Sequence, residues 1–366
     1  MFRKSQWRKI DWIIIFSALL LVGIGLLSLY STSLARNDFL NFQKQLIFLA
    51  IALFLFILFS FFDYRVFKTN PYLILILYLL SIFFLLGLFF WAPEIRGTKS
   101  WYKIGYFSFD PIEFTKLILI ILLAKYFSSR HIEMYRLSHI IISGAYVLLP
   151  TFLVFFQPNL GSGLVLIAIW LGILVVSGIK LRHFLIISFL FILFLSLSWL
   201  YLLKDYQKTR IVSFLLPQKE PLGAGWSQRQ AKITIGSGGI GGRGIAQGSQ
   251  VQYGFLPEAQ TDFIFAAIAE ETGFLGAGFL FLLFSVLLWR IIRIGLLARE
   301  NFPRLFSAGF AISLMTQIFI NIGMNIGLVP IIGLPLPFVS YGGSNLIMNM
   351  IGLGILESIY RINREL

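Results

Sequence analysis

Two acidic residues stand where a long polar segment meets an apolar one, and both could take part in chemistry. Asp262 directly precedes the apolar residues 263–269, and Glu258 lies four positions before it. A carboxylate at such a place can act as a general base that removes a proton from a hydroxyl group, which accelerates a reaction about 10²- to 10⁴-fold. An acid at a helix start also interacts favourably with the helix dipole. The position of Asp262 alone favours this second interpretation, in which the acid only stabilises the start of a helix.

A second pair of charged residues lies at the start of another apolar segment. Glu113 and Lys116 are three positions apart, which places them on one face of a helix. Ionisable groups inside a membrane span are costly and usually face a partner or a cavity. The two residues could form an ion pair that makes both charges tolerable. They could instead line a water-filled cavity in which Lys116 offers a cation to a phosphate, and the spacing leaves both interpretations open.

A glycine-rich segment precedes Asp262, and two adjacent acids follow it. Glu270 and Glu271 lie eight and nine positions after Asp262, about 12–13 Å deeper if the segment is helical. Such acids need a polar interior or partners such as arginines. Glycine lets main-chain N–H groups approach an anionic ligand closely, although composition favours a flexible linker equally. The glycines in question are Gly223, Gly225, Gly236, Gly238, Gly239, Gly241, Gly242, Gly244 and Gly248.

The elements that must position these residues are membrane-spanning helices. Of the 366 residues 58% are hydrophobic and only 13% are charged, against roughly 25% charged residues in soluble domains. We therefore expect an all-α integral membrane protein, with the whole chain, 1–366, as one membrane domain. Because cysteine is absent, disulfides and thiolate metal sites are excluded. Runs of about 20 apolar residues predict ten spans, near 10–30, 41–62, 72–91, 111–127, 139–156, 160–179, 184–203, 262–289, 305–326 and 341–360.

The net charge of +14 follows the positive-inside rule rather than indicating nucleic acid. With ten spans, both termini lie on one side, and the segments on that side collect most of the basic residues. This predicts that the N- and C-termini are cytoplasmic. The segment 204–261, between the seventh and eighth spans, then becomes a large extracytoplasmic loop. The basic residues assigned to the inner side are Arg3, Lys4, Arg8, Lys9, Arg65, Lys68, Lys125, Arg130, Arg136, Lys180, Arg182, Arg290, Arg293, Arg299, Arg304, Arg361 and Arg364.

A polar, proline-interrupted stretch follows the ninth span. Asn321 and Asn325 are four positions apart and share a helix face, where they could form hydrogen bonds between helices. The prolines that follow, at 330, 335 and 337, predict non-helical backbone. Such backbone is tolerated at membrane depth only where it is buried in protein or lines a cavity.

Several ordered segments of the sequence resemble the SEDS family (shape, elongation, division and sporulation), which contains RodA and FtsW. The resemblance covers nearly the whole chain. Differences from the usual family pattern occur at Asp110, Asn159 and Asn345 and leave the diphosphate contacts open. The matching segments are 96–102 (RGTKSWY), 113–116 (EFTK), 157–161 (QPNLG), 236–244 (GSGGIGGRG), 255–265 (FLPEAQTDFIF), 269–273 (AEETG) and 321–343 (NIGMNIGLVPIIGLPLPFVSYGG).

This resemblance implies a peptidoglycan glycosyltransferase in the bacterial cytoplasmic membrane. Family members polymerise lipid II and release undecaprenyl diphosphate. Asp262 matches the essential acid of the family, and Trp101, Glu113 and Lys116 match residues that line its cavity. The resemblance also implies a class B penicillin-binding protein, a transpeptidase, as partner, with the nascent glycan strand as second substrate. The segments 205–211 and 221–225 resemble RodA more than FtsW, which implies a role in elongation and rod shape.

Joining an α-linked donor into a β-linked chain inverts the anomeric carbon, so the acceptor hydroxyl must attack opposite the diphosphate. We expect Asp262 to be the base for that hydroxyl, with Glu258 beside it in the substrate-binding region. Cations or amides can stabilise the leaving diphosphate. The candidates are Arg96, Lys116, Arg210 and the amides of the glycine-rich segment.

Two alternatives remain at this point. A flippase for a lipid-linked precursor would also need a polar cavity, but near the bilayer midplane. A non-catalytic scaffold for a transpeptidase would need no base. No protein metal site is expected from the sequence, while a requirement for a divalent cation remains possible, and no organic cofactor is indicated.

Overall fold

The structure is a computed structural model that describes residues 10–93, 100–105, 107–129, 137–201, 205–216 and 223–364. Most of this is helical, and the long helices coincide with the ten predicted spans. They are α1 (Trp12–Arg36), α2 (Leu40–Phe61), α4 (Pro71–Trp91), α5 (Pro111–Ser128), α6 (Leu137–Phe156), α7 (Leu160–Val176), α8 (Leu181–Tyr201), α12 (Ile264–Leu297), α13 (Asn301–Ile326) and α14 (Gly343–Asn363). The prediction of an all-α membrane fold is confirmed.

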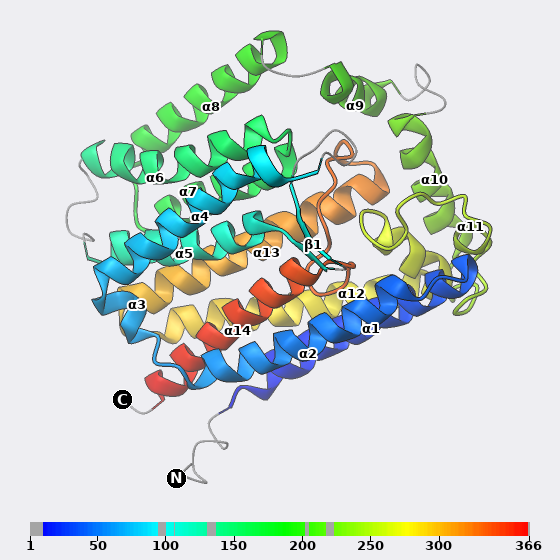
Figure 1. Cartoon of the computed structure of the whole chain (residues 1–366), viewed down its shortest axis with the longest axis horizontal. Helices are drawn as coiled ribbons and strands as arrows, with labels where there is room; N and C mark the ends of the chain where they lie inside the picture. The colour runs from blue at the N-terminus through cyan, green and yellow to red at the C-terminus, as the bar shows by residue number, and fades with distance from the viewer. Residues whose placement is uncertain are drawn as a thin grey trace.

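The remaining elements are short. Helix α3 (Arg65–Thr69) joins α2 to α4, and a hairpin of β1 (Tyr102–Ile104) and β2 (Phe107–Phe109) precedes α5. The two strands are antiparallel, with Tyr102 opposite Phe109. The segment between α8 and α12 contains α9 (Asp205–Leu215), α10 (Ala224–Ser237) and α11 (Ser249–Gln252). These three helices lie at the end of the bundle away from the two chain termini (Figure 1).

Within the described residues, seven of the helices are long and apolar enough to cross a membrane: α1, α2, α4, α6, α8, α12 and α13. Helix α7 is apolar but has only 17 residues. Helices α5 and α14 carry more polar residues, and nearly all their side chains are buried against other helices. Polar groups in lipid are tolerated where they face protein, and the buried side chains of these two helices meet that condition.

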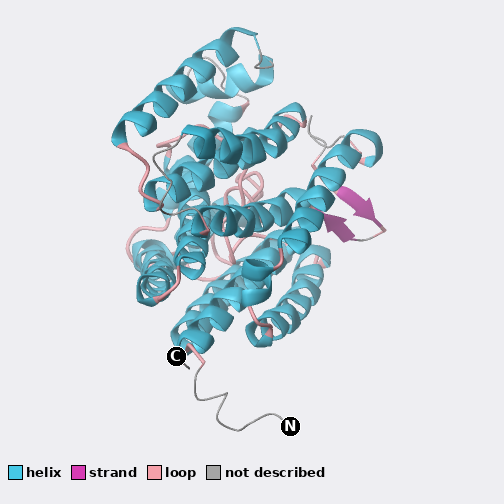
Figure 2. Cartoon of the chain, turned by 90° about the vertical axis from the view of Figure 1, so that its left-hand side faces the viewer, coloured by secondary structure: helices cyan, strands magenta, loops and turns pink. Residues whose placement is uncertain are grey.

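Helices α5, α13 and α14 form the interior of the bundle. Helix α13 packs against α5, α7 and α12, while α14 packs along α2 and also touches α5. Helix α8 lies at the edge (Figure 1), and few of its residues are buried. Seen from the side, the helices gather into one bundle, with the hairpin projecting beside it (Figure 2). The interior therefore contains the helices that carry Glu113, Lys116 and the asparagines of α13.

The start of α5 is fixed by its cap. Asp110 is the N-cap residue, and its Oδ1 accepts a hydrogen bond of 2.9 Å from the amide of Ile112. Pro111 occupies the first helical position, where its missing N–H has no cost. The amide of Asp110 donates to the hydroxyl of Ser344 in α14 over 2.9 Å. These contacts set the first turn of α5 and hence the direction of Glu113.

The segment 327–342 is non-helical and largely buried, as the prolines predict. Leu334, Leu336, Phe338 and Val339 are at most 2% exposed. The main-chain polar groups find partners inside the protein: Leu336 N donates to Ser340 Oγ. This re-entrant segment therefore meets the condition for irregular backbone at membrane depth, which is burial in protein.

Candidate active site

Asp262 lies in a turn that leads into α12. Its neighbour Phe263 is the N-cap residue, so Asp262 stands before the first helical turn. The Asp262 carboxylate faces the re-entrant segment, since a Cβ added at Gly333 would lie 3.4 Å from Asp262 Oδ2. Gly333 has a φ of +78°, a conformation that glycine adopts easily. The backbone of the re-entrant segment therefore approaches the carboxylate where there is no side chain in between.

The main-chain carbonyl of Asp262 is held by two side chains of α13. Asn321 Nδ2 donates to it over 3.2 Å, and Asn325 Nδ2 donates over 2.9 Å. Both asparagines are fully buried. The prediction of interhelical hydrogen bonds is confirmed for Asn325, whose Oδ1 accepts from the amide of Ala266 in α12. Both asparagines also bind the backbone of the candidate base.

The turn before Asp262 is compact and tied to the first two spans. Glu258 has a φ of +46°, and its carbonyl accepts hydrogen bonds from the amides of Thr261 and Phe263. Gln260 is 5% exposed. Its side chain accepts from Asn41 Nδ2 over 2.7 Å and donates to Thr32 Oγ1 over 3.1 Å. Asp262 is therefore presented on a rigid turn rather than on a mobile loop.

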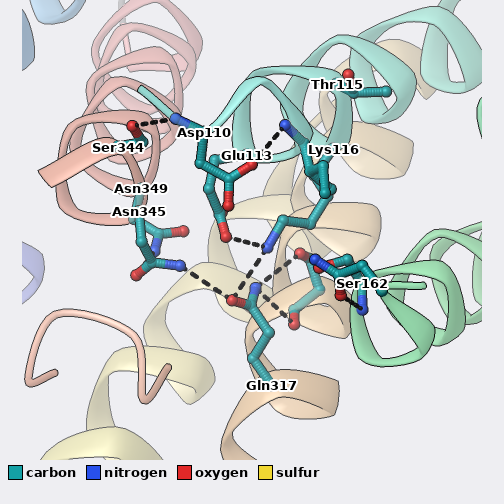
Figure 3. A network of polar contacts seen from close by, with 12 residues as sticks. Asp110, Glu113, Thr115, Lys116, Ser162, Gln317, Ser344, Asn345 and Asn349 are labelled. Carbon is teal, nitrogen blue, oxygen red and sulfur yellow. Dashed lines mark hydrogen bonds and ion pairs between the residues drawn. The ribbon is translucent and has the colours of Figure 1, made fainter. Parts of the chain in front are cut away.

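Glu113 and Lys116 form the predicted ion pair. Lys116 Nζ lies 2.7 Å from Glu113 Oε1, and their side chains are only 4% and 6% exposed. Lys116 also donates to Gln317 Oε1 over 3.2 Å. The same oxygen accepts from Asn345, which in turn accepts from Asn349. Figure 3 shows Lys116 between Glu113 and Gln317, with Asn345 reaching Gln317 from α14.

Glu113 and Lys116 also line a cavity, as the alternative interpretation expects, while the contact of Lys116 with a phosphate stays a prediction. A small cavity is bordered by both side chains and by Gln317, Ser313 and Asn349. It has room for about one water molecule. Lys116 uses two of its three N–H groups for Glu113 and Gln317. The ion pair and the cavity are therefore two aspects of one polar site inside the bundle.

Helix α13 connects this polar site to Asp262. Gln317, Asn321 and Asn325 follow one another at four-residue intervals, so they lie on one face about 6 Å apart along the axis. Gln317 binds Lys116, while Asn321 and Asn325 bind the carbonyl of Asp262. The buried cation thus lies about one helical turn deeper in the bundle than the contacts that hold Asp262.

The remaining predicted site residues belong to other parts of the chain. Trp101 is half-buried beside Ser100, whose hydroxyl accepts a hydrogen bond of 3.2 Å from Asn159. Arg210 is half-buried in α9, a helix that packs against α10. Arg96 lies outside the described residues. The structure therefore brings together Glu113 with Lys116 and Asp262 with Glu258, while Arg210 sits on a separate helix.

The glycine-rich segment has a different role from the one predicted. The amides of Arg243 and Gly244 donate to the main-chain carbonyls of Glu270 and Glu271 over 2.9 and 3.0 Å, and the amide of Gly242 donates to Gly238. A Cβ at Gly242 would collide with the Glu271 carbonyl. The expectation that these amides are available to a diphosphate is wrong for residues 242–244. They pack the loop onto α12, which is kinked at Gly273.

Glu270 and Glu271 are buried, as their position within the span predicts, but arginines are not the partners observed. Glu270 accepts hydrogen bonds from the amides of Gln250 and Val251 over 2.9 and 3.1 Å. Glu271 accepts from the hydroxyl of Ser31 and from the amide of Ala246. The loop amides do bind anions, and these are the carboxylates of the chain itself.

Sequence reasoning did not identify Gln260 and Asn349 as parts of the site, and it named Asn345 only as a difference from the family pattern. Each is buried and bonded to another part of the chain. Asn349 follows Asn345 by one helical turn, and this spacing within an apolar segment was the available signal. For metals, no group of three or more His, Cys, Asp or Glu in the described ranges is placed to hold an ion.

Comparison with known proteins agrees with the motifs. The family model described as cell cycle protein, for FtsW, RodA and SpoVE, matches residues 11–365. Stage V sporulation protein E of Bacillus subtilis is 36% identical over 362 residues, which cover 97% of this chain and 98% of that protein. Peptidoglycan glycosyltransferase MrdB of Escherichia coli K12 is 39% identical over 265 residues, 72% of this chain and 71% of that protein.

A solved structure shares the fold. It is described as the structural coordination of polymerization and crosslinking by a peptidoglycan synthase complex. The TM-score is 0.83 at 32% identity, and the match covers 97% of this chain and 98% of that chain.

The fold, the site and these similarities define a multi-pass inner-membrane enzyme of the glycosyltransferase class. The chain belongs to the FtsW, RodA and SpoVE family, as its motifs predict.

Proposed function

We propose that the chain polymerises lipid II into glycan strands and releases undecaprenyl diphosphate at each step. The acceptor is a sugar hydroxyl, and the donor carries an α-linked diphosphate. Attack from the opposite face inverts the anomeric carbon and gives a β-linkage. The protein must therefore supply a base for the hydroxyl and positive charge or hydrogen-bond donors for the diphosphate.

Asp262 is the base in this proposal. The observation that carries it is the placement of its carboxylate just before the start of α12, facing Gly333, on a backbone held by buried side chains. A preorganised carboxylate of this kind suits proton abstraction, because catalysis depends on the base lying within hydrogen-bond reach of the proton. Glu258, which shares the turn, belongs to the substrate-binding region and is not the base.

Lys116 supports the diphosphate side of the proposal. One of its three N–H groups is not used by Glu113 or Gln317. The cavity beside it has room for about one water molecule, so in this proposal Lys116 acts on the diphosphate through its charge rather than by direct contact. In a site that excludes water, a fixed cation stabilises developing negative charge far more than it would in bulk solvent. Arg96 and Arg210 are the candidates for direct contact with the diphosphate, and Trp101 is a candidate for a wall of the substrate site.

We place the site on the extracytoplasmic side, with both termini in the cytoplasm and the segment 204–261 as an outer part of one membrane domain, 1–366. Basic side chains at the terminal end of the bundle, among them Arg65, Lys125 and Arg293, support this orientation through the positive-inside rule.

The partner in this proposal is a class B penicillin-binding protein, which would cross-link the strands that the chain makes. Support comes from the fold shared with a peptidoglycan synthase complex that couples polymerization and crosslinking. For the cell, we propose a role in elongation and rod shape, supported by the RodA-like segments 205–211 and 221–225. If this is right, depletion produces round cells; long filaments would indicate division, and an effect confined to spores would indicate sporulation.

The two alternatives are less well supported by the geometry. A flippase should have its polar site near the bilayer midplane, whereas the proposed orientation puts Asp262 at the outer start of α12. A scaffold that only recruits a transpeptidase has no need for a carboxylate on a clamped turn. Adding a chelator to the assay tests whether polymerisation requires a divalent cation.

Purified protein in detergent, with lipid II and with a class B partner, tests the function directly. We expect glycan strands on a gel and equimolar release of undecaprenyl diphosphate. Detergent removes the two membrane sides, so a flippase would give no product. Absence of polymer from folded protein with its partner would contradict the proposal.

A further inference from the structure

The side-chain amides of α13 join the two backbone segments that meet at the Asp262 carboxylate. Asn321 Nδ2 donates to the carbonyl of Asp262 and also, over 2.7 Å, to the carbonyl of Leu334. Leu334 directly follows Gly333, the residue that the carboxylate faces. One NH₂ group therefore sets the separation between the turn that carries Asp262 and the re-entrant segment opposite to it.

Asn325 completes the clamp and also caps α12. Its Nδ2 donates to the carbonyl of Asp262 and, over 2.8 Å, to the carbonyl of Asn321. Its Oδ1 accepts from the amide of Ala266 over 3.1 Å. The N-cap residue Phe263 supplies no side-chain hydrogen bond, so an orphan amide of the first turn is satisfied by a neighbouring helix instead.

Asn321 holds its orientation at a cost. Its Oδ1 is buried and has no hydrogen-bond partner, which is unfavourable for a polar atom inside a protein. If the amide were rotated by 180°, Oδ1 would face the carbonyl oxygens of Asp262 and Leu334 and would be repelled by both. A buried polar atom without a partner beside a candidate catalytic residue is consistent with a functional role, because an unfavourable free energy of this kind is tolerated where the geometry is needed for function.

We propose that Asn321 and Asn325 are positioning residues, which fix the Asp262 carboxylate against the re-entrant segment so that it meets the acceptor hydroxyl in a reactive geometry. They act through the backbone of Asp262 and do not touch substrate. This inference rests on the proposed function, since it assumes that Asp262 is the base.

The test measures steady-state kinetics with lipid II for Asn325→Leu and Asn321→Leu. Because the substrate contacts are untouched, KM should stay within about threefold, while kcat should fall about 10- to 100-fold, as expected for a misplaced catalytic group. Asn321→Ser and Asn325→Ser are milder changes that replace the Leu variants if those do not fold. In the Asp262→Asn background, the same changes should cause no further loss of residual turnover, because the base is already gone.

The matched control is Ser143→Ala, which removes a buried interhelical hydrogen bond of 3.1 Å to Trp170 far from the site. It should lower stability and leave kcat per folded molecule unchanged. A kcat within threefold of wild type in the asparagine variants, or a loss that persists undiminished in the Asp262→Asn background, would overturn the inference. If Asp262→Asn itself polymerises normally, the assignment of the base has failed; if it is inactive while the asparagine variants are normal, only the positioning role has failed.

Discussion

The buried ion pair of Glu113 and Lys116 allows a prediction in which stability and activity separate. In Lys116→Met, the Glu113 carboxylate loses its partner while it remains only 6% exposed. Gln317 Oε1 keeps its hydrogen bond to Asn345, so the main loss is that of the compensating charge. Removing one member of a buried pair costs about 3–5 kcal/mol, whereas an exposed pair contributes at most about 1 kcal/mol.

The second change restores neutrality. In the double variant Glu113→Gln with Lys116→Met, neither position carries a charge, and replacing both members of a buried pair is often close to neutral for stability. We therefore expect the double variant to regain most of the free energy of unfolding that the single variant loses. Reversible unfolding in mixed micelles measures this difference, with the fraction of helix followed by circular dichroism.

Activity should not return with stability. If Lys116 supplies the positive charge for the diphosphate, the folded double variant should still polymerise lipid II poorly. A single variant that loses less than about 1 kcal/mol would refute the buried-pair reasoning. A double variant with wild-type turnover would show that Lys116 serves the fold alone.

Three further predictions address the re-entrant segment, the start of α5 and the topology. Gly25→Val should lower both stability and activity, because a Cβ at Gly25 collides with the carbonyl of Val339; thermal unfolding and lipid II turnover check this. Burial, and next the charge of Glu113, raise the pKa of Asp110 to about 7. The folded state therefore favours the protonated carboxyl, and the stability of the wild-type protein should fall as pH rises from about 4 through 7. Asp110→Asn, which keeps the cap acceptor without the charge, should flatten that dependence in unfolding curves recorded between pH 5 and 8. Gln250→Cys in intact cells should react with an impermeant maleimide from outside, and labelling only after the cytoplasmic side is opened would reverse the proposed orientation.

Much of the fold follows from the sequence because lipid imposes a simple rule. Apolar runs of about 20 residues must become helices that satisfy their own backbone, and all ten predicted spans coincide with long helices. Helices α5 and α14 were found as well, although their charged and amide side chains lower their hydropathy. The kink at Gly273 was not predicted, because it depends on the loop that packs against it.

The candidate site could be predicted only where its contacts are local. The three-residue spacing of Glu113 and Lys116 predicts their ion pair directly. Gln317, which also binds Lys116, lies 201 positions away, and no local pattern indicates that contact. The same limit applies to Asn325 and Asp262, which are 63 positions apart.

The glycine-rich segment shows why composition can mislead. Glycines predict close approach by the backbone, and such approach does occur between residues 238–244 and α12. Composition does not indicate which group approaches. The anions that the loop amides bind are Glu270 and Glu271, because these carboxylates would otherwise be buried without partners.

The most direct measurement of the central claim is the rate of lipid II polymerisation by Asp262→Asn, with Glu258→Gln as its matched control. Asn keeps the size of the side chain but takes no proton from a hydroxyl, so the rate should fall at least about 10²-fold while the protein stays folded. Glu258→Gln removes a charge from the same turn and should have a milder effect. A rate for Asp262→Asn within about tenfold of wild type is too fast for a lost base and would contradict the account.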